Sequence, residues 1–214
     1  MPIPPIDVSP ETEAAYEAAR LQLRERLAAW SAVSGAILAP DAGEELLHYK
    51  WGYLDRHLTR WARSDLDAVF LELYPAKMIA DDGELDQVLV EAATFVRFLA
   101  DTGLLDPASE DPEVLCDHLE QIGPRFHRHM ADASRYSMGK RVLMEATVRG
   151  VRLDDREAMQ DFIQAFNASP LAERETVLGP LAGPVPAKGR TGRFTPPGTP
   201  PRRKPSDRRR HRRR

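Results

Sequence analysis

Cysteine is nearly absent from this sequence: Cys116 is the one thiol in 214 residues. A single cysteine excludes an internal disulfide and leaves no cysteine-rich framework for zinc. Its expected role is that of a small buried hydrophobic side chain.

Long hydrophobic runs are also lacking. The longest uncharged stretch, AAWSAVSGAILAP at residues 28–40, is well short of the roughly 20 residues that a membrane-spanning helix needs. The first residues, MPIPPIDVSPETE, have neither the basic charge nor the apolar core of a signal peptide. These absences predict a cytoplasmic protein without a membrane span.

Strand patterns are missing as well, since no useful stretch alternates apolar and polar residues and no repeat of fixed period aligns. Apolar residues recur with the helical period instead, which predicts an all-α fold. We place the helix at 84–102 at the centre of the core, because its apolar period is almost unbroken. The expected helices span residues 10–32, 53–63, 64–74, 84–102, 111–130, 134–149, 154–166 and 170–178, with a loop at residues 34–45. Ser9 should cap the first helix, Pro75 should stop the third, and Asp111 should open the fifth, which Pro124 either breaks or continues.

The composition predicts three regions. Residues 1–9 should be a flexible amino terminus, and residues 10–179 a single multi-helix domain with an acidic surface. After Gly179 the chain consists mainly of Pro, Gly, Thr and Arg. Such a segment cannot bury enough apolar surface to offset its ordering entropy, so residues 180–214 are predicted to be a disordered tail rich in proline and arginine.

Basic charge is concentrated at the carboxyl end. Residues 188–214 hold twelve Lys and Arg against one Asp, a net charge of +11, whereas residues 1–187 hold eighteen against thirty-two, a net charge of −14. Guanidinium groups bind phosphate in bidentate fashion and release counterions, so RNA, DNA or the ribosome surface would suit this segment. A solubility tail, a tail that folds back on the acidic domain and a tail that contacts anionic lipid remain open. The predicted nucleic-acid-binding residues of the tail are Arg202, Arg203, Lys204, Arg208, Arg209, Arg210, Arg212, Arg213 and Arg214.

Aromatic residues make up 7% of the chain, yet several gather in HYKWGYLDRHLTRW at residues 48–61. Tyr49, Trp51 and Tyr53 alternate as in an extended segment, which would turn all three rings to one side. In the helix expected next, Leu54, Leu58 and Trp61 should face the core. Arg56, Arg60 and Arg63 repeat the same spacing on the opposite face.

Two interpretations of this segment stay open. Aromatic rings beside a basic face suit single-stranded nucleic acid, in which bases stack and phosphates pair with arginine. Alternatively the tryptophans cover the core and the arginines pair with carboxylates, and we favour this structural interpretation in so acidic a domain. The arginine face is therefore a candidate docking surface only.

The sequence supplies no convincing catalytic or metal site. His118, His127 and His129 lie near Cys116, but side chains two residues apart on a helix diverge and cannot share a metal ion. The S-x-x-K motif at residues 137–140 resembles that of penicillin-recognising enzymes, but it lacks the companion S-D-N and K-T-G motifs. We expect no catalytic residue, metal ion or cofactor.

The run KWGYLDRHLTRW at residues 50–61, the run FLADTGLLDPAS at 98–109 and the arginine-rich end together resemble a family of all-helical proteins from high-GC bacteria. The resemblance covers residues 46–180. No activity is established for that family, so the resemblance implies a helical domain and no mechanism.

These observations lead to three hypotheses. The first is a non-enzymatic accessory protein that binds RNA or DNA non-specifically through its arginine-rich tail. The second is a helical protein-interaction module whose acidic surface meets a basic partner, with the tail as a tether or an autoinhibitory segment. The third, a hydrolytic or metal-dependent enzyme, is the most remote, because no nucleophile, base and oxyanion-binding group come together in the sequence.

Overall fold

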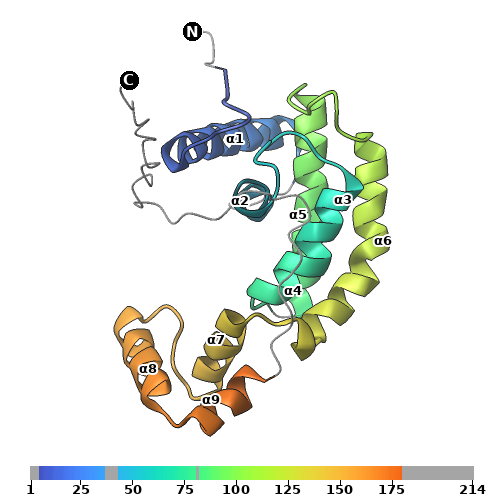
Figure 1. Ribbon diagram of the computed structural model, residues 1–214. Coiled ribbons are helices and arrows are strands. Elements are labelled where there is room, and N and C mark those ends of the chain that lie inside the picture. The colour runs from blue at the N-terminus through green and yellow to red at the C-terminus, as the bar shows by residue number, and fades with distance from the viewer. Residues whose placement is uncertain (1–4, 37–42, 81, 180–214) are drawn as a thin grey trace, which may run out of the picture.

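A computed structural model describes residues 5–36, 43–80 and 82–179 of the chain (Figure 1). These residues form helices joined by loops and contain no strand, which confirms the all-α prediction. The predicted disordered tail, residues 180–214, lies outside the described residues, as do residues 37–42 of the loop predicted at residues 34–45.

The first helix, α1 (Glu13–Ser34), begins later than expected. Thr12, and not Ser9, is its N-cap: the Thr12 hydroxyl accepts a hydrogen bond from the Ala15 amide at 3.2 Å. The helix ends at Gly35, whose φ of 74° is readily adopted by a residue without a Cβ atom. Helix α2 (Glu44–Tyr53) packs against α1.

Three helical segments follow without a break: α3 (Arg63–Asp67), a π-helical stretch (Ala68–Leu73) and α4 (Tyr74–Lys77). Pro75 was predicted to stop this helix, but the helix continues to Lys77. In a regular α-helix the Pro75 ring would clash with the Leu71 carbonyl, and Pro75 has no backbone N–H to donate to that carbonyl. We attribute the wider π-helical turns before Pro75 to these two effects. The Leu71 carbonyl accepts from His129 Nδ1 at 2.9 Å and Arg135 Nη1 at 3.4 Å.

Two long helices follow, α5 (Asp82–Asp101) and α6 (Pro112–Ala131) (Figure 1). Helix α6 packs against α5 and against the continuous helix that runs from α3 to α4. Asp111 is the N-cap of α6, and its side chain accepts a hydrogen bond from the Glu113 amide. The helix runs through Pro124 without a break. The prediction that the helix at 84–102 lies at the centre is confirmed. Its buried core residues are Leu85, Leu89, Ala92, Ala93, Phe95, Val96, Phe98 and Leu99.

The remaining helices form a second, smaller hydrophobic cluster that the sequence did not predict. After a 3-10 turn (Ala133–Arg135), helices α7 (Met138–Val148), α8 (Arg156–Ala168) and α9 (Leu171–Leu178) gather at one end of the molecule (Figure 1). The buried members of this cluster are Ala146, Met159, Phe162 and Phe166.

The start of α7 is fixed to the end of α4. The Ser137 amide donates to the Ala76 carbonyl at 2.9 Å, and the Lys140 ammonium donates to the Pro75 carbonyl at 3.0 Å. These carbonyls lie in the last turn of α4, where a helix leaves acceptors unsatisfied.

None of the helices in the described part of the chain combines the length and apolar character required to cross a membrane.

Candidate functional site

The aromatic residues of the segment at 48–61 do not form a common platform. Tyr49, Trp51 and Tyr53 lie in helix α2 and not in the extended segment that was predicted. Tyr49 and Tyr53 are one turn apart on the same side, with ring centroids 5.8 Å apart. Trp51 stacks on Tyr16 of α1 at 4.5 Å and donates its indole N–H to the Pro10 carbonyl. Because helical residues two apart diverge, Trp51 cannot share a surface with the two tyrosines.

The helix predicted for residues 53–63 is absent, and most of this stretch is a loop. Its backbone bonds to segments remote in sequence: the Leu58 amide donates to the Val8 carbonyl, and the Thr59 carbonyl accepts from the Asp106 amide. The inward placement of Leu58 and Trp61 is nevertheless confirmed, since both are fully buried.

The three arginines of this segment therefore share no helix face, and each one has a partner. Arg56, at φ 66°, lies 5.3 Å from the Trp51 ring. Arg60 pairs with Asp55 at 2.7 Å, and Arg63 pairs with Glu110 at 2.6 Å. The hydrogen bond from Arg63 is the main reason that the pKa of the Glu110 carboxyl is lowered. Nucleic-acid binding by Arg56, Arg60 and Arg63 stays a prediction, as does binding by Arg202, Arg203, Lys204, Arg208, Arg209, Arg210, Arg212, Arg213 and Arg214, which lie outside the described residues.

A buried lysine organises this segment. Lys50 of α2 has no exposed surface, and its ammonium lies 2.7 Å from Asp65 Oδ2 and 3.1 Å from Asp55 Oδ1. The ammonium also lies 4.8 Å from the centroid of the Trp61 ring. Asp65 accepts the Ala62 amide as well, at 3.0 Å, and so caps α3. One cation thus connects α2, the loop and α3.

Asp55 lies on the solvent side of this network. Burial raises the pKa of its carboxyl, but hydrogen bonds from the Arg60 guanidinium and the His57 amide, together with the charge of Lys50, outweigh burial and lower the pKa overall. Asp55 is therefore ionised at neutral pH and holds two cations, Lys50 and Arg60.

The histidines and the cysteine do not converge. His118 contacts Asp67 at 3.0 Å, and His127 contacts Asp86 at 2.8 Å. His129 donates a hydrogen bond to the Leu71 carbonyl. Cys116 is buried, as predicted, and burial raises the pKa of its thiol. In residues 5–36, 43–80 and 82–179, no three His, Cys, Asp or Glu side chains come close enough together to hold a metal ion.

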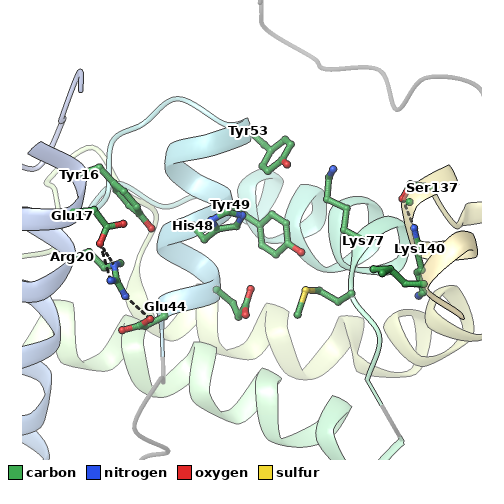
Figure 2. Close-up of a pocket in the computed structure, with 14 residues that line it drawn as sticks. Tyr16, Glu17, Arg20, Glu44, His48, Tyr49, Tyr53, Lys77, Ser137 and Lys140 are labelled. Carbon is green, nitrogen blue, oxygen red and sulfur yellow. Dashed lines mark hydrogen bonds and ion pairs between the residues drawn. The ribbon is translucent and has the colours of Figure 1, made fainter. Parts of the chain in front are cut away.

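A cleft of about 580 Å³ with chemically diverse walls lies between α1, α2, the end of α4 and the start of α7 (Figure 2). Sequence reasoning missed it because it is made from four segments remote in the chain. We call it the polar cleft. It is lined by Tyr16, Glu17, Arg20, Glu44, Glu45, His48, Tyr49, Tyr53, Lys77, Met78, Ser137, Gly139, Lys140 and Leu143.

The two ends of the polar cleft differ in charge. At the α1 end, Arg20 pairs with Glu17 at 2.8 Å and with Glu44 at 2.6 Å. At the α7 end the ionisable lining residues are Lys77 and Lys140 (Figure 2). Burial raises the pKa of the Tyr16 phenol to about 12 and also raises that of Tyr49, so both hydroxyl groups stay neutral.

The S-x-x-K residues lie at this second end, in structural roles. The Ser137 hydroxyl accepts the Lys140 amide at 3.2 Å and so caps α7. The Lys140 side chain is 4% exposed, and its ammonium lies 3.8 Å from the centroid of the Tyr136 ring. Since the ammonium donates to the Pro75 carbonyl, these contacts do not make Lys140 a base for Ser137.

No protein family, curated protein or solved structure matches this chain. The resemblance to helical proteins of high-GC bacteria accordingly stays a prediction.

Replacing Lys50 with alanine should lower the free energy of unfolding by about 3 kcal/mol, because removal of one partner leaves the Asp65 carboxylate without its buried cation. Lys50→Met keeps much of the side-chain volume but removes the charge, so it should lower the free energy of unfolding by most of the same amount. The control is Lys77→Ala, at an exposed lysine, which should change stability by less than about 0.5 kcal/mol. Urea unfolding measures all three variants, and equal stabilities for Lys50→Ala and Lys77→Ala would contradict the assigned role.

Lys140 should make stability depend on pH in the alkaline range. Burial lowers its pKa from an ordinary 10.5 to about 8. Between these values the unfolded chain binds more protons than the native one, so stability rises with pH relative to a Lys140→Met variant. The change should reach at most about 3 kcal/mol, since each pKa unit corresponds to about 1.4 kcal/mol. Urea unfolding of both proteins from neutral pH to about pH 10 measures it, and a constant difference would show that the ammonium is well solvated.

Proposed function

We propose that this protein is a cytoplasmic, non-enzymatic accessory protein that binds RNA or DNA through the arginine-rich segment at residues 188–214. The observation that carries the proposal is the division of charge, with a net +11 in this segment and −14 in the rest of the chain. Affinity for a polyanion grows with the number of phosphates that are neutralised, and clustered arginines neutralise several at once.

The contacts within the helical body support the assignment of nucleic-acid binding to the carboxyl-terminal segment. Arg60 and Arg63 already contact carboxylates at 2.7 and 2.6 Å, and Arg56 lies over Trp51. A phosphate would have to compete with these partners. We therefore assign most of the affinity to the carboxyl-terminal segment and a secondary contribution to the three arginines. Binding of this kind carries no sequence specificity, because phosphate contacts do not distinguish bases.

A second candidate is a helical interaction module that meets a basic partner. The observation that favours it is a row of acidic side chains on α6. Glu113, Asp117 and Glu120 are exposed and spaced by about one helical turn, so they lie on one face. In this case the carboxyl-terminal segment would compete for that face as a tether or an autoinhibitor.

The test is binding of the full chain and of residues 1–187 to labelled single-stranded RNA and duplex DNA at several salt concentrations. The full chain should bind with a steep salt dependence, because each phosphate contact to duplex DNA contributes about −0.9 to the slope of log K against log salt. Residues 1–187 should lose nearly all binding. The matched comparison is the full chain with Arg56, Arg60 and Arg63 all replaced by alanine. This variant should lose much less of its affinity for RNA and DNA than residues 1–187 do.

Equal affinities of the full chain and residues 1–187 would contradict the proposal. If neither binds at moderate salt, the acidic interaction module becomes the better account. In that case removal of residues 188–214 should leave binding to a basic protein unchanged or make it stronger.

A further inference from the structure

Helices α7, α8 and α9 have a hydrophobic cluster of their own, which is distinct from the main core. Partly buried side chains complete this cluster around Ala146, Met159, Phe162 and Phe166, and they are Val142, Leu143, Val151, Val177 and Leu178. All of these residues lie within residues 138–179, which we call the α7–α9 unit. The apolar contacts that hold the three helices together are therefore made within the unit itself.

The α7–α9 unit meets the rest of the domain at the end of α4 (Figure 1). In the described residues the chain passes from α6 to α7 once, through residues 132–137. At this crossing the Ser137 amide donates to the Ala76 carbonyl at 2.9 Å, and the Lys140 ammonium donates to the Pro75 carbonyl at 3.0 Å. Both acceptors lie in the last turn of α4, where the helix dipole favours a cation. The joint is thus polar and lies at one edge of the unit.

The polar cleft borders α7 on the side that faces α2. Gly139 and Leu143 of α7 line this cleft together with His48 and Tyr53 of α2 (Figure 2). On this side α7 therefore faces a cleft of about 580 Å³ and not a closely packed helix. The open side leaves room for the unit to move relative to α2.

Lys140 limits how strongly the joint is stabilised. Its side chain is 4% exposed, and its ammonium lies on the Pro75 carbonyl and 3.8 Å from the centroid of the Tyr136 ring. These partners carry no formal negative charge, and burial lowers the pKa of Lys140 to about 8. The ammonium would regain full hydration if the unit moved away from α4, so its burial partly offsets the hydrogen bonds of the joint.

We propose that the α7–α9 unit is a separately folded body that docks on the negative end of α4 through Ser137 and Lys140 and swings about residues 132–136 when this contact is lost. Local opening in such cooperative units is a general property of folded domains. Residues 180–214 follow α9 in the sequence, so movement of the unit moves the attachment point of the arginine-rich segment. The movement does not require nucleic-acid binding by residues 188–214, so either proposal can fail alone.

The test is the distance between spin labels at Ala18 on α1 and Ala165 on α8, two exposed positions, measured by double electron–electron resonance in the full chain. Both residues are replaced with cysteine in a Cys116→Ala background, because Cys116 is the one native thiol. This parent protein should give one narrow distance distribution. Lys140→Glu should give a broad distribution, because the Pro75 carbonyl and the negative end of α4 repel a carboxylate.

Lys140→Glu should leave α7 folded, because Ser137 and a glutamate three residues later have the spacing of a capping box. Far-ultraviolet circular dichroism should therefore show the same helical signal as in the parent protein. The matched control is Lys77→Glu, which makes the same change of charge at an exposed lysine in the last turn of α4. This control should keep the narrow distance distribution.

A narrow distribution in Lys140→Glu would overturn the proposal, and so would equal broadening in both variants. Broad distances together with a loss of helical signal would also overturn it, because helices α7 to α9 would then need the contact with α4 in order to fold.

Discussion

The fold around helix α2 depends on one buried cation. The Lys50 ammonium has no exposed surface, and a charge in that position is tolerated only when it is paired and hydrogen bonded. Asp65 and Asp55 satisfy it, and the Trp61 ring lies beside it. Because Asp65 caps α3 and Asp55 lies in the loop, this contact fixes the path of the chain between the two helices.

This arrangement also decides which arginines can meet a polyanion. Once Asp55 is fixed by Lys50, it holds Arg60 at 2.7 Å, while Glu110 holds Arg63 at 2.6 Å. The segment that most resembles a nucleic-acid platform in the sequence is thus largely occupied by its own carboxylates. Most of the basic charge lies elsewhere, in residues 188–214, to which we assign nucleic-acid binding as a proposal.

The sequence predicted those parts of the structure that follow from local patterns. The apolar period of α5, the Asp111 cap of α6 and the burial of Cys116 agree with it. The predicted helix at residues 53–63 was wrong because Leu58 and Thr59 bond to Val8 and Asp106, and these partners are invisible to a local period. The polar cleft could not be predicted for the same reason. Lys50 lies between Tyr49, which is buried, and Trp51, which is half-buried. A lysine flanked by two aromatic residues was the sequence signal that could have indicated a buried ion pair.

The most direct test of this account is photo-crosslinking of the full chain to a uridine-rich RNA, with the crosslinked peptides identified by mass spectrometry. The account predicts crosslinks within residues 188–214 and few or none at Tyr49, Trp51 and Trp61, whose rings pack within the helical body. Crosslinks concentrated on Tyr49, Trp51 or Trp61 would contradict it, because they would require these rings to leave their packing and serve as a base-stacking surface.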